Sequence, residues 1–429
     1  MSYVRAFPFE TISVVGLGYV GLPTAAMFAS RKVRVVGVDI NAHTVETINR
    51  GDIHIVEPDL DIAVHAAVTE GYLRATTAPE PADAFLIAVP TPFRGAARQP
   101  DLSYIQAASQ AVAPVLKAGD LVVLESTSPV GATEQMAAWL AKARPDLTFP
   151  QTHGEASDIR IAHCPERVLP GKVMQELVSN HRVVGGLTPR CSSLACRLYR
   201  IFVTGDCVVT SARTAEMAKL TENSFRDVNI AFANELSMIC ERLDIDVWEL
   251  IRLANRHPRV DILQPGPGVG GHCIAVDPWF IVHGAPDEAR LIRTAREVND
   301  AKPEWVLDKV RAAVGGLLMQ NTGTTAADVT LAIYGLTFKP NIDDLRESPS
   351  LKIACQIARE HPGPIRVVEP NIEALPGGLM HAVLTPLPAD GVDAQVHVIL
   401  VDHAVFQGMP LPQGAIVDTK GLFASRRVT

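Results

Sequence analysis

Three glycines near the start of the chain constrain its fold more than any other feature. They follow the β-branched run of residues 11–15 and precede an alanine-rich stretch that predicts a helix over residues 20–30. Glycines so placed allow a tight strand-to-helix turn, close approach of backbone N–H groups to a pyrophosphate, and a helix N-terminus that faces the anion. The pattern therefore predicts a Rossmann dinucleotide-binding unit. The residues expected at the cofactor are Gly16, Gly18, Tyr19, Val20 and Gly21.

A second predicted strand ends at Asp39, 21 residues after Gly18. A carboxylate at this position hydrogen-bonds the ribose 2′-hydroxyl and repels a 2′-phosphate, so NAD is favoured over NADP. Two later strands end near Thr91 and Thr127, at the sheet edge where open α/β sheets bind ligands. These threonines are either cofactor contacts or simple turn formers.

The alternation of strand and helix signals predicts three parts in an α/β chain. From residue 11 to about 205, β-branched runs alternate with helical stretches, which indicates a parallel sheet covered on both faces. Residues 213–243 have apolar positions at helical spacing with no Gly or Pro, which predicts one long helix. A second helical run covers residues 285–314, and strands then return. The predicted parts are an N-terminal Rossmann domain (1–205), a central helical segment (206–312) and a C-terminal Rossmann-like domain (313–429).

Composition limits the partners of the chain. Its 429 residues favour two or three cores, and 39 basic against 47 acidic residues give a net charge of −8. No global basic field exists to hold a nucleic acid or an anionic membrane, and no apolar run approaches the ~20 residues of a membrane span. Seven scattered cysteines without a CxxC pair argue against a disulfide framework and a zinc site. We expect a cytoplasmic protein with no nucleic-acid partner, no membrane partner and no metal.

One cysteine stands apart from the other six. Cys273 follows the side-chain-poor segment QPGPGVGGH and precedes Asp277 by four residues. Such a loop lets a substrate approach a thiol closely, so Cys273 is a candidate nucleophile. Beside a dinucleotide, a thiol can trap the aldehyde made from an alcohol as a thiohemiacetal, and loss of a second hydride gives a thioester that hydrolyses to an acid. The predicted net reaction is alcohol to acid.

The long predicted helix has a polar stripe. Lys219, Asn223 and Arg226 lie at positions i, i+4 and i+7 and therefore share one helix face. The stripe is either a solvated face or part of a site in which the lysine moves protons or holds an oxyanion. Helical spacing alone leaves both interpretations open.

Six motifs resemble, in the same order, those of the UDP-glucose/GDP-mannose dehydrogenase family. They are GLGYVGLP, STSPVG, PERVLPG, AEMAKLTENSFRDVNIAFANE, GVGGHCIAVDP and GLTFKPNIDDLRESP. The resemblance spans nearly the whole chain and implies an NAD-dependent four-electron oxidation of a nucleotide sugar. It also implies that the C-terminal domain binds the UDP-sugar, and that the central segment carries catalytic residues and a dimer interface. We therefore expect a homodimer or a higher homo-oligomer, since a long, largely apolar helix needs a partner.

The segment RHPRVDILQPGPGVGGHCIAVDPWFIV, with VVEPNI and LVDH, is most similar to the branch that acts on UDP-N-acetyl-D-mannosamine. This implies oxidation at C6 to UDP-N-acetyl-D-mannosaminuronate, for bacterial surface polysaccharide synthesis. Pro170 and Val276 stand where the UDP-glucose branch has charged residues, which disfavours that substrate. The alternatives are a UDP-N-acetylglucosamine 6-dehydrogenase, or a non-catalytic sensor of NAD or a nucleotide sugar.

The resemblance assigns roles to individual positions. It implies that Cys273 is the nucleophile, that Lys219 transfers a proton or binds an oxyanion, and that Asn223 and Asp277 orient a water and support the site. Glu166 matches an acid–base residue of relatives, or is an exposed carboxylate in a turn. Thr127 and Arg346 match contacts to NAD. The matched substrate positions are Arg167, Val168, Lys219, Asn223, Arg226, His257, Arg259, Gly270, Phe338, Lys339 and Lys420.

Overall fold

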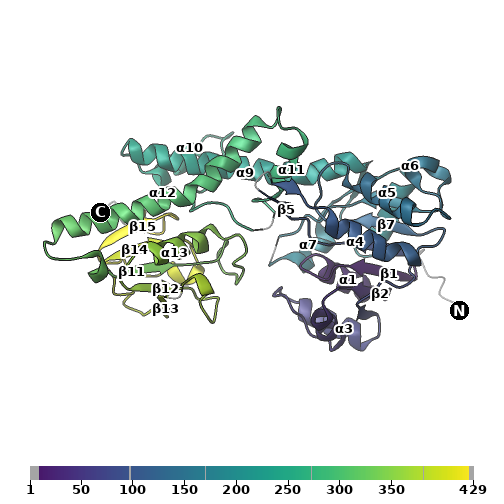
Figure 1. Ribbon diagram of the computed structural model, residues 1–429, viewed down its shortest axis with the longest axis horizontal. Helices are drawn as coiled ribbons and strands as arrows, with labels where there is room; N and C mark the ends of the chain where they lie inside the picture. The colour runs from purple at the N-terminus through teal and green to yellow at the C-terminus, as the bar shows by residue number, and fades with distance from the viewer. Residues whose placement is uncertain (1–8, 96–97, 170, 272, 380, 425–429) are drawn as a thin grey trace. The chain divides into compact units, whose positions relative to one another are not determined.

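The computed structural model (Figure 1) describes residues 9–95, 98–169, 171–271, 273–379 and 381–424. Pro170 lies outside the described residues. The chain divides into two compact units, one formed by Met1–Glu222 with Trp279–Gly284 and the other by Asn223–Pro278 with Ala285–Thr429. Each unit contains one main sheet.

The sheet of the first unit has eight strands in the order β10-β9-β8-β7-β4-β1-β2-β3. Strand β1 lies between β2 and β4 and is parallel to both, so the strand order reverses at β1. In open α/β sheets, this reversal opens a crevice at the carboxyl ends of the strands, and ligands bind there. The strands are β1 Thr11–Val15, β2 Arg34–Val38, β3 Leu73–Thr76, β4 Ala84–Ile87, β7 Leu121–Leu124, β8 Arg160–His163, β9 Arg182–Gly186 and β10 Cys207–Ser211. A two-stranded hairpin adds β5 Phe93–Arg94 and β6 Gln99–Pro100.

Helices cover both faces of this sheet because successive side chains of each strand point to opposite faces. Val14 belongs to an apolar cluster with helices α1, α3, α7 and α8, whereas Val15 belongs to a second cluster with α4 and α5. The helices of the unit are α1 Gly21–Ser30, α2 Ala42–Asn49, α3 Leu60–Thr69, α4 Ser103–Val112, α5 Ala132–Ala143, α6 Pro150–His153, α7 Val173–Ser179 and α8 Pro189–Tyr199.

The second unit has a five-stranded sheet in which every pair of strands is parallel, in the order β13-β12-β11-β14-β15. Helices α12 and α13 pack against one face, where Val306 and Ile353 join the same buried cluster. The strands are β11 Leu331–Tyr334, β12 Ile365–Val368, β13 Ala382–Leu384, β14 Val396–Ile399 and β15 Ala415–Asp418. The remaining helices are α9 Ala212–Arg242, α10 Val247–Ala254, α11 Asp277–Gly284, α12 Arg290–Gln320 and α13 Pro349–Glu360.

The structure confirms the predicted fold class of an N-terminal Rossmann sheet, a central helical region and a C-terminal parallel sheet. The helix predicted over residues 213–243 is α9, at Ala212–Arg242. Two details differ from expectation. Strands β8 and β9 are antiparallel, because the chain turns back at the carboxyl edge of β8 instead of crossing the sheet. Helix α12 continues through Gly315 and Gly316, where the sequence pattern ended it, because Leu317 and Leu318 pack against the core of the C-terminal sheet.

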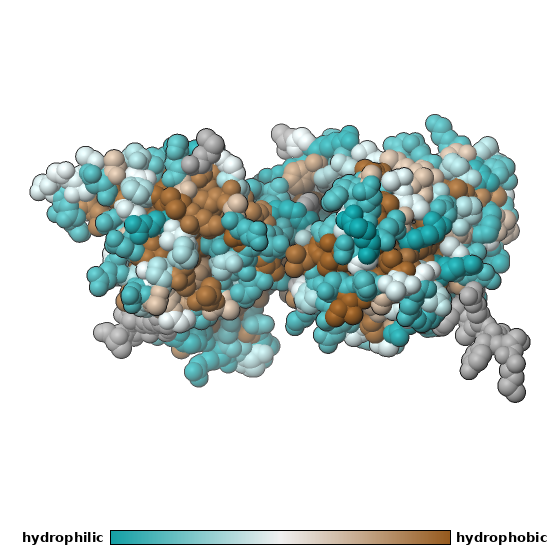
Figure 2. All heavy atoms as spheres, turned by 90° about the horizontal axis from the view of Figure 1, so that it is seen from below, coloured by the Kyte–Doolittle hydropathy of each residue, from teal (hydrophilic) through white to brown (hydrophobic). Residues whose placement is uncertain are grey.

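The outer surface mixes polar and apolar residues. On the face shown in Figure 2, apolar residues gather in several patches among hydrophilic side chains. Within the described ranges, no helix is both long enough and apolar enough to cross a membrane.

Candidate active site

The first turn of the Rossmann unit has the geometry of a dinucleotide cradle. Gly16 has a φ of 93°, and a Cβ added there would lie 2.5 Å from the carbonyl oxygen of Ala88. A Cβ on Gly21 would collide with the carbonyl of Gly16, so both positions require glycine. Among the described residues, no atom lies within 4 Å of a Cβ added to Gly18, which leaves open space over the turn. The turn therefore fits a pyrophosphate at the N-terminus of α1.

Asp39 is fixed beside this turn. Its Oδ2 accepts a hydrogen bond from the backbone N–H of Leu17 at 3.0 Å, and its Oδ1 accepts one from Asn41 at 2.9 Å. The carboxylate is partly exposed at the end of β2. A carboxylate at this point of a Rossmann unit can accept hydrogen bonds from ribose hydroxyls.

The structure also brings Thr91 and Thr127 together at the carboxyl ends of β4 and β7. The Thr91 hydroxyl donates to the carbonyl oxygen of Thr127 at 2.5 Å, and both residues are partly exposed. Tyr19 and Val20 lie in the preceding glycine turn and are also partly exposed. The four residues thus line the same edge of the sheet as Asp39.

A buried polar cluster lies directly below this edge, and sequence reasoning did not find it. Tyr199 donates to Oε1 of Glu125 at 2.6 Å, and both side chains are buried. Within the described residues, Oε2 of Glu125 has no hydrogen-bond partner. Burial, reinforced by the charge of Glu166, raises the pKa of Glu125 to about 7. The only sequence signal for this acid is its place at the end of the buried run LVVL.

Glu166 belongs to the same cluster. Its side chain is buried, with Oε2 paired to Arg182 Nη1 at 2.6 Å and Oε1 accepting from the Arg167 backbone N–H at 2.6 Å. The interpretation of Glu166 as an exposed carboxylate in a turn is therefore wrong, because the buried guanidinium of Arg182 holds it inside. The neighbouring Arg167 side chain pairs with Glu222 of α9 at 2.5 Å, and Val168 packs against the core.

Lys219 lies on α9, where Glu216 anchors the helix. The buried carboxylate of Glu216 accepts hydrogen bonds from the backbone N–H groups of Gly131 and Thr133 and from the Thr133 hydroxyl, at 2.6 to 2.8 Å. These contacts tie the first turns of α9 to the N-terminus of α5. Lys219 follows three residues later and is half-buried.

The second unit brings Asn223, Asp277 and the turn of Cys273 together. Asn223 Nδ2 donates to Asp277 Oδ2 at 2.5 Å, and both side chains are buried. The backbone N–H of Asp277 donates to the carbonyl oxygen of Cys273 at 2.9 Å, so the turn that carries the exposed thiol leads directly into α11. Arg226, three residues after Asn223 on α9, is exposed. The polar stripe therefore changes from buried to exposed along the helix.

The glycine-rich approach to Cys273 packs against the loop between β11 and α13. A Cβ on Gly270 would lie 2.8 Å from Cβ of Phe338, and the Gly271 N–H donates to the carbonyl oxygen of Arg346 at 3.3 Å. Gly271 has a φ of 81° and lies under the Phe338 ring. The glycine-rich loop before Cys273 and the loop that contains Phe338 thus form one surface, although they are far apart in the sequence. The two loops can approach this closely because the glycines have no side chains.

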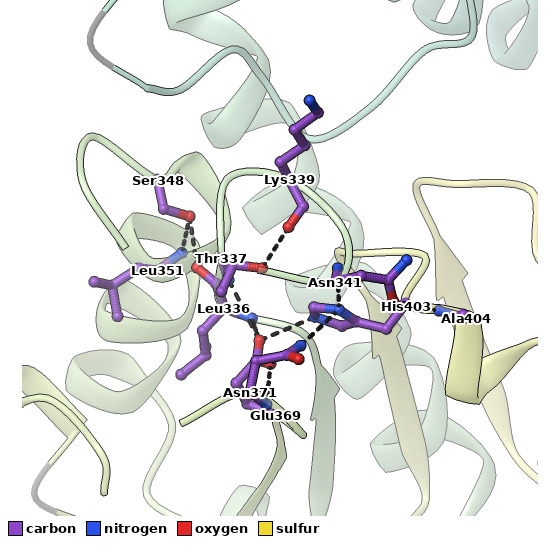
Figure 3. Close-up of polar contacts among 10 residues, drawn as sticks. All are labelled: Leu336, Thr337, Lys339, Asn341, Ser348, Leu351, Glu369, Asn371, His403 and Ala404. Carbon is purple, nitrogen blue, oxygen red and sulfur yellow. Dashed lines mark hydrogen bonds and ion pairs between the residues drawn. The ribbon is translucent and has the colours of Figure 1, made fainter. Parts of the chain in front are cut away.

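The other predicted substrate residues of the second unit are distributed around these loops. Lys339 follows Phe338, and Figure 3 shows its side chain extending away from the polar cluster beneath the loop. Lys420 pairs with Asp402 at 3.3 Å and lies near Gly266. Arg346 is exposed and pairs with Asp344, and His257 and Arg259 are exposed after α10.

Three family models match consecutive parts of the chain. They are the NAD binding domain of the UDP-glucose/GDP-mannose dehydrogenase family at residues 10–203, its central domain at 213–301 and its UDP binding domain at 332–425.

Individual relatives match over nearly the whole chain. A UDP-N-acetyl-D-mannosamine dehydrogenase of Yersinia pestis is 65% identical over 97% of this chain and 99% of its own. An NDP-N-acetyl-D-galactosaminuronic acid dehydrogenase of Ralstonia nicotianae is 62% identical over 98% of both chains. The structure of a UDP-D-ManNAc dehydrogenase from Pyrococcus horikoshii has a TM-score of 0.84, at 37% identity, over 96% of both chains.

Proposed function

Because the chain belongs to the UDP-glucose/GDP-mannose dehydrogenase family, with an NAD binding domain and a UDP binding domain, we propose that it oxidises UDP-N-acetyl-D-mannosamine at C6 to the uronate. One structural observation supports this proposal most directly. The loop of the exposed thiol Cys273 packs directly on Phe338 of the UDP binding domain, so a UDP-sugar held there would have its sugar near the thiol.

The residues of the first unit fit NAD as the cofactor. The turn at Gly16 and Gly18 leaves room for a pyrophosphate, and Asp39 offers its carboxylate to a ribose. Bound NAD supplies a hydride acceptor, and two are reduced for each sugar oxidised to an acid. Thr91 and Thr127 are proposed to line its nicotinamide end. Arg346 is proposed as a further NAD contact.

Residues of α9 and of the thiol loop support the thiol chemistry. The Cys273 thiolate would attack the aldehyde carbon, and the thiohemiacetal would lose a second hydride to give a thioester. Asn223 is held by Asp277, so its amide is fixed and can orient the water that hydrolyses the thioester. Lys219 is proposed to take the proton of the sugar hydroxyl or to stabilise the oxyanion.

Glu166 has a different role in this proposal from the acid–base role that the resemblance implied. Its carboxylate is buried and paired with Arg182, and its other oxygen holds the backbone of Arg167. Both carboxylate oxygens are thus engaged by protein groups, an arrangement that suits a residue holding neighbouring backbone in place. Glu166 is therefore proposed to position the segment of Arg167 and Val168 at the substrate. The remaining substrate contacts proposed are Arg226, His257, Arg259, Gly270, Lys339 and Lys420.

A second candidate substrate follows from the comparisons. The Ralstonia relative, named for an N-acetylgalactosaminuronic acid, is nearly as similar to this chain as the mannosamine enzyme. Turnover measured on purified UDP-N-acetyl-D-mannosamine, UDP-N-acetylglucosamine and UDP-N-acetylgalactosamine tests the choice. We expect the highest kcat/KM on the mannosamine sugar, with two NADH formed per sugar. A preference for another epimer would refute the proposed substrate, and binding of NAD and UDP without turnover of any sugar would indicate a sensor.

We also propose that the protein acts as a homodimer. Phe225, Phe232 and Ile239 recur every seven residues on α9 and are 71%, 53% and 44% exposed. Apolar residues at this spacing form one stripe, which the same stripe of a second copy can cover. Light scattering should therefore give a dimer or a larger assembly, and Phe232→Asp should give smaller particles. A monomeric wild-type protein would contradict the proposal.

The proposed location is the cytoplasm. All seven cysteines are thiols in the structure, which is the state that a reducing compartment maintains. Both proposed small-molecule ligands, NAD and a nucleotide sugar, would be drawn from the same compartment.

A further inference from the structure

The two sheets contain the same hydrogen-bonding module, one where β1 enters the loop that follows it and one where β11 does. In the first unit, the Gly16 N–H donates to the carbonyl oxygen of Val38 at 2.8 Å, and the Leu17 N–H donates to the carboxylate of Asp39 at 3.0 Å. A Gly-Leu pair thus meets the acid that ends the neighbouring strand. In a Rossmann unit, that acid is the one available to a ribose.

The second unit repeats the module with a glutamate. The Gly335 N–H donates to the carbonyl oxygen of Val368 at 2.9 Å, and the Leu336 N–H donates to Glu369 Oε2 at 2.7 Å. Unlike Asp39, Glu369 is buried. Its Oε1 accepts the backbone and side-chain N–H groups of Asn371 at 3.0 and 3.1 Å, and its Oε2 lies 3.1 Å from His403 Nε2. This acid therefore faces the protein interior and is not placed to bind a ribose.

His403 connects Glu369 to the loop above it (Figure 3). Its Nδ1 accepts the Asn341 backbone N–H at 3.0 Å, so Nδ1 has no proton. Nε2 then carries the proton and donates to Glu369. Asn341 is further fixed by its left-handed φ of 61° and by the Ala404 N–H, which donates to its side-chain oxygen at 2.9 Å. A buried relay thus runs from the end of β12 to the loop that follows β11.

We infer that Glu369 and His403 are positioning residues that hold the loop of Phe338 and Lys339 in the shape that binds the UDP part of the substrate. The pair fixes the loop at both sides of Lys339, through Leu336 before it and Asn341 after it. Between these anchors, the Thr337 hydroxyl donates to the carbonyl oxygen of Lys339 at 2.8 Å. The inference rests on the proposed function, in which Lys339 contacts the nucleotide sugar.

The relay suits this role because every polar atom that it buries is used. A fully satisfied buried network has one geometry and transmits it to the groups it holds, whereas removing one partner leaves a buried donor or acceptor without its hydrogen bond. Replacing His403 with an apolar residue would leave Glu369 and the Asn341 N–H each without one partner. The loop would then lose its fixed shape, and the affinity for UDP would fall with it.

The test is calorimetric titration of the full-length protein with UDP, which needs no turnover. We expect His403→Leu and Lys339→Ala each to weaken UDP binding about tenfold or more, on the scale of one lost charge-assisted contact. In the double variant, the effect should be little larger than that of Lys339→Ala alone, because His403 acts through the loop. His403→Gln, which keeps a side-chain N–H donor, should recover much of the affinity. NAD binding should not change in any of these variants.

His397 provides a matched control from the same sheet. It is also buried, and it contacts Tyr334 and the carbonyl oxygens of Ala394 and Gln413 instead of the loop. His397→Leu should lower the melting temperature about as much as His403→Leu does, without changing the Kd for UDP. If His403→Leu does not fold, Glu369→Gln removes the charge of the relay at nearly constant volume, and it should also weaken UDP binding.

The outcomes separate the two claims. Wild-type protein that binds no UDP would refute the proposed function, and the positioning role with it. Wild-type protein that binds UDP, beside a folded His403→Leu or Glu369→Gln variant that binds it equally well, would refute the positioning role alone. Additive effects of His403→Leu and Lys339→Ala would also refute it, because the histidine would then not act through the loop.

Discussion

Asn223 and Asp277 are 54 residues apart in the sequence, yet the asparagine amide donates to the aspartate carboxylate at 2.5 Å in a buried contact. The same aspartate donates its backbone N–H to the carbonyl oxygen of Cys273. One contact therefore couples the polar stripe of α9 to the turn that presents the thiol. A change in either side chain would therefore disturb both the helix face and the thiol turn that the proposed reaction uses.

The first prediction concerns this pair. Asn223→Ala should lower kcat about 100-fold, because it removes the amide that orients water and leaves the buried carboxylate without this donor. The free energy of unfolding should fall by only about 1–3 kcal/mol, the usual cost of an unsatisfied buried group. Steady-state NADH formation and urea unfolding measure the two effects. A variant that loses stability but keeps its kcat would show that the contact is only structural.

The second prediction concerns the thiol. Cys273→Ser should abolish the reaction or stop it after the first oxidation, because a hydroxyl is a much weaker nucleophile than a thiolate at neutral pH. Rapid mixing with excess NAD should give at most one NADH per sugar, against two for the wild type. Cys355→Ser, a change of another partly exposed thiol in the same unit, should leave the yield at two. A fully active Cys273→Ser enzyme would refute the thiohemiacetal step.

The sequence was informative where local chemistry decides the structure. Gly16 and Asp39 could be placed together because a glycine turn and a strand end at the right separation have few alternative arrangements. Helix α9 could be predicted because 31 residues without Gly or Pro leave no place to break it. These features depend on backbone sterics and periodicity, which a single sequence shows directly.

Contacts between distant segments were less predictable. Tyr199 and Glu125 are 74 residues apart, and nothing in either segment indicates that the two side chains meet. The burial of Glu166, in the loop after β8, likewise depends on Arg182, which lies in β9. Tertiary packing decides such pairs, and it also carries α12 past two glycines that are weak helix formers.

The third prediction tests the packing of the thiol loop. Gly270→Ala would place a Cβ within 2.8 Å of three neighbours, the Glu347 carbonyl oxygen, Phe338 Cβ and Pro349 Cδ. We expect a loss of stability of about 1–3 kcal/mol and a marked loss of activity, because the loop must move away from Phe338. Gly266→Ala is the matched control in the same loop, since Lys420 Nζ, at 3.8 Å, is the one atom of the described residues near its Cβ. Equal activities of the two variants would contradict the close packing.

The fourth prediction concerns pH and Glu125, whose pKa is raised from 4.5 to about 7 by burial and then by the nearby Glu166. Below pH 4.5 the carboxyl is protonated in both the folded and unfolded states, so the shift costs no stability. As the pH rises towards 7, the unfolded state ionises first, and the free energy of unfolding falls by up to about 3 kcal/mol. Above the folded pKa the penalty is constant.

Glu125→Gln isolates this effect, because the amide oxygen still accepts from Tyr199 and the side chain no longer titrates. Urea unfolding of both proteins at pH 5 and pH 7.5 should show the variant gaining stability relative to the wild type as the pH rises. All other titrating groups are shared, so they largely cancel in the difference between the two proteins. If the free energies of unfolding of the two proteins changed in parallel with pH, Glu125 would be ionised in the folded state at pH 5. Arg182 would then compensate the charge of Glu125 as well as that of Glu166.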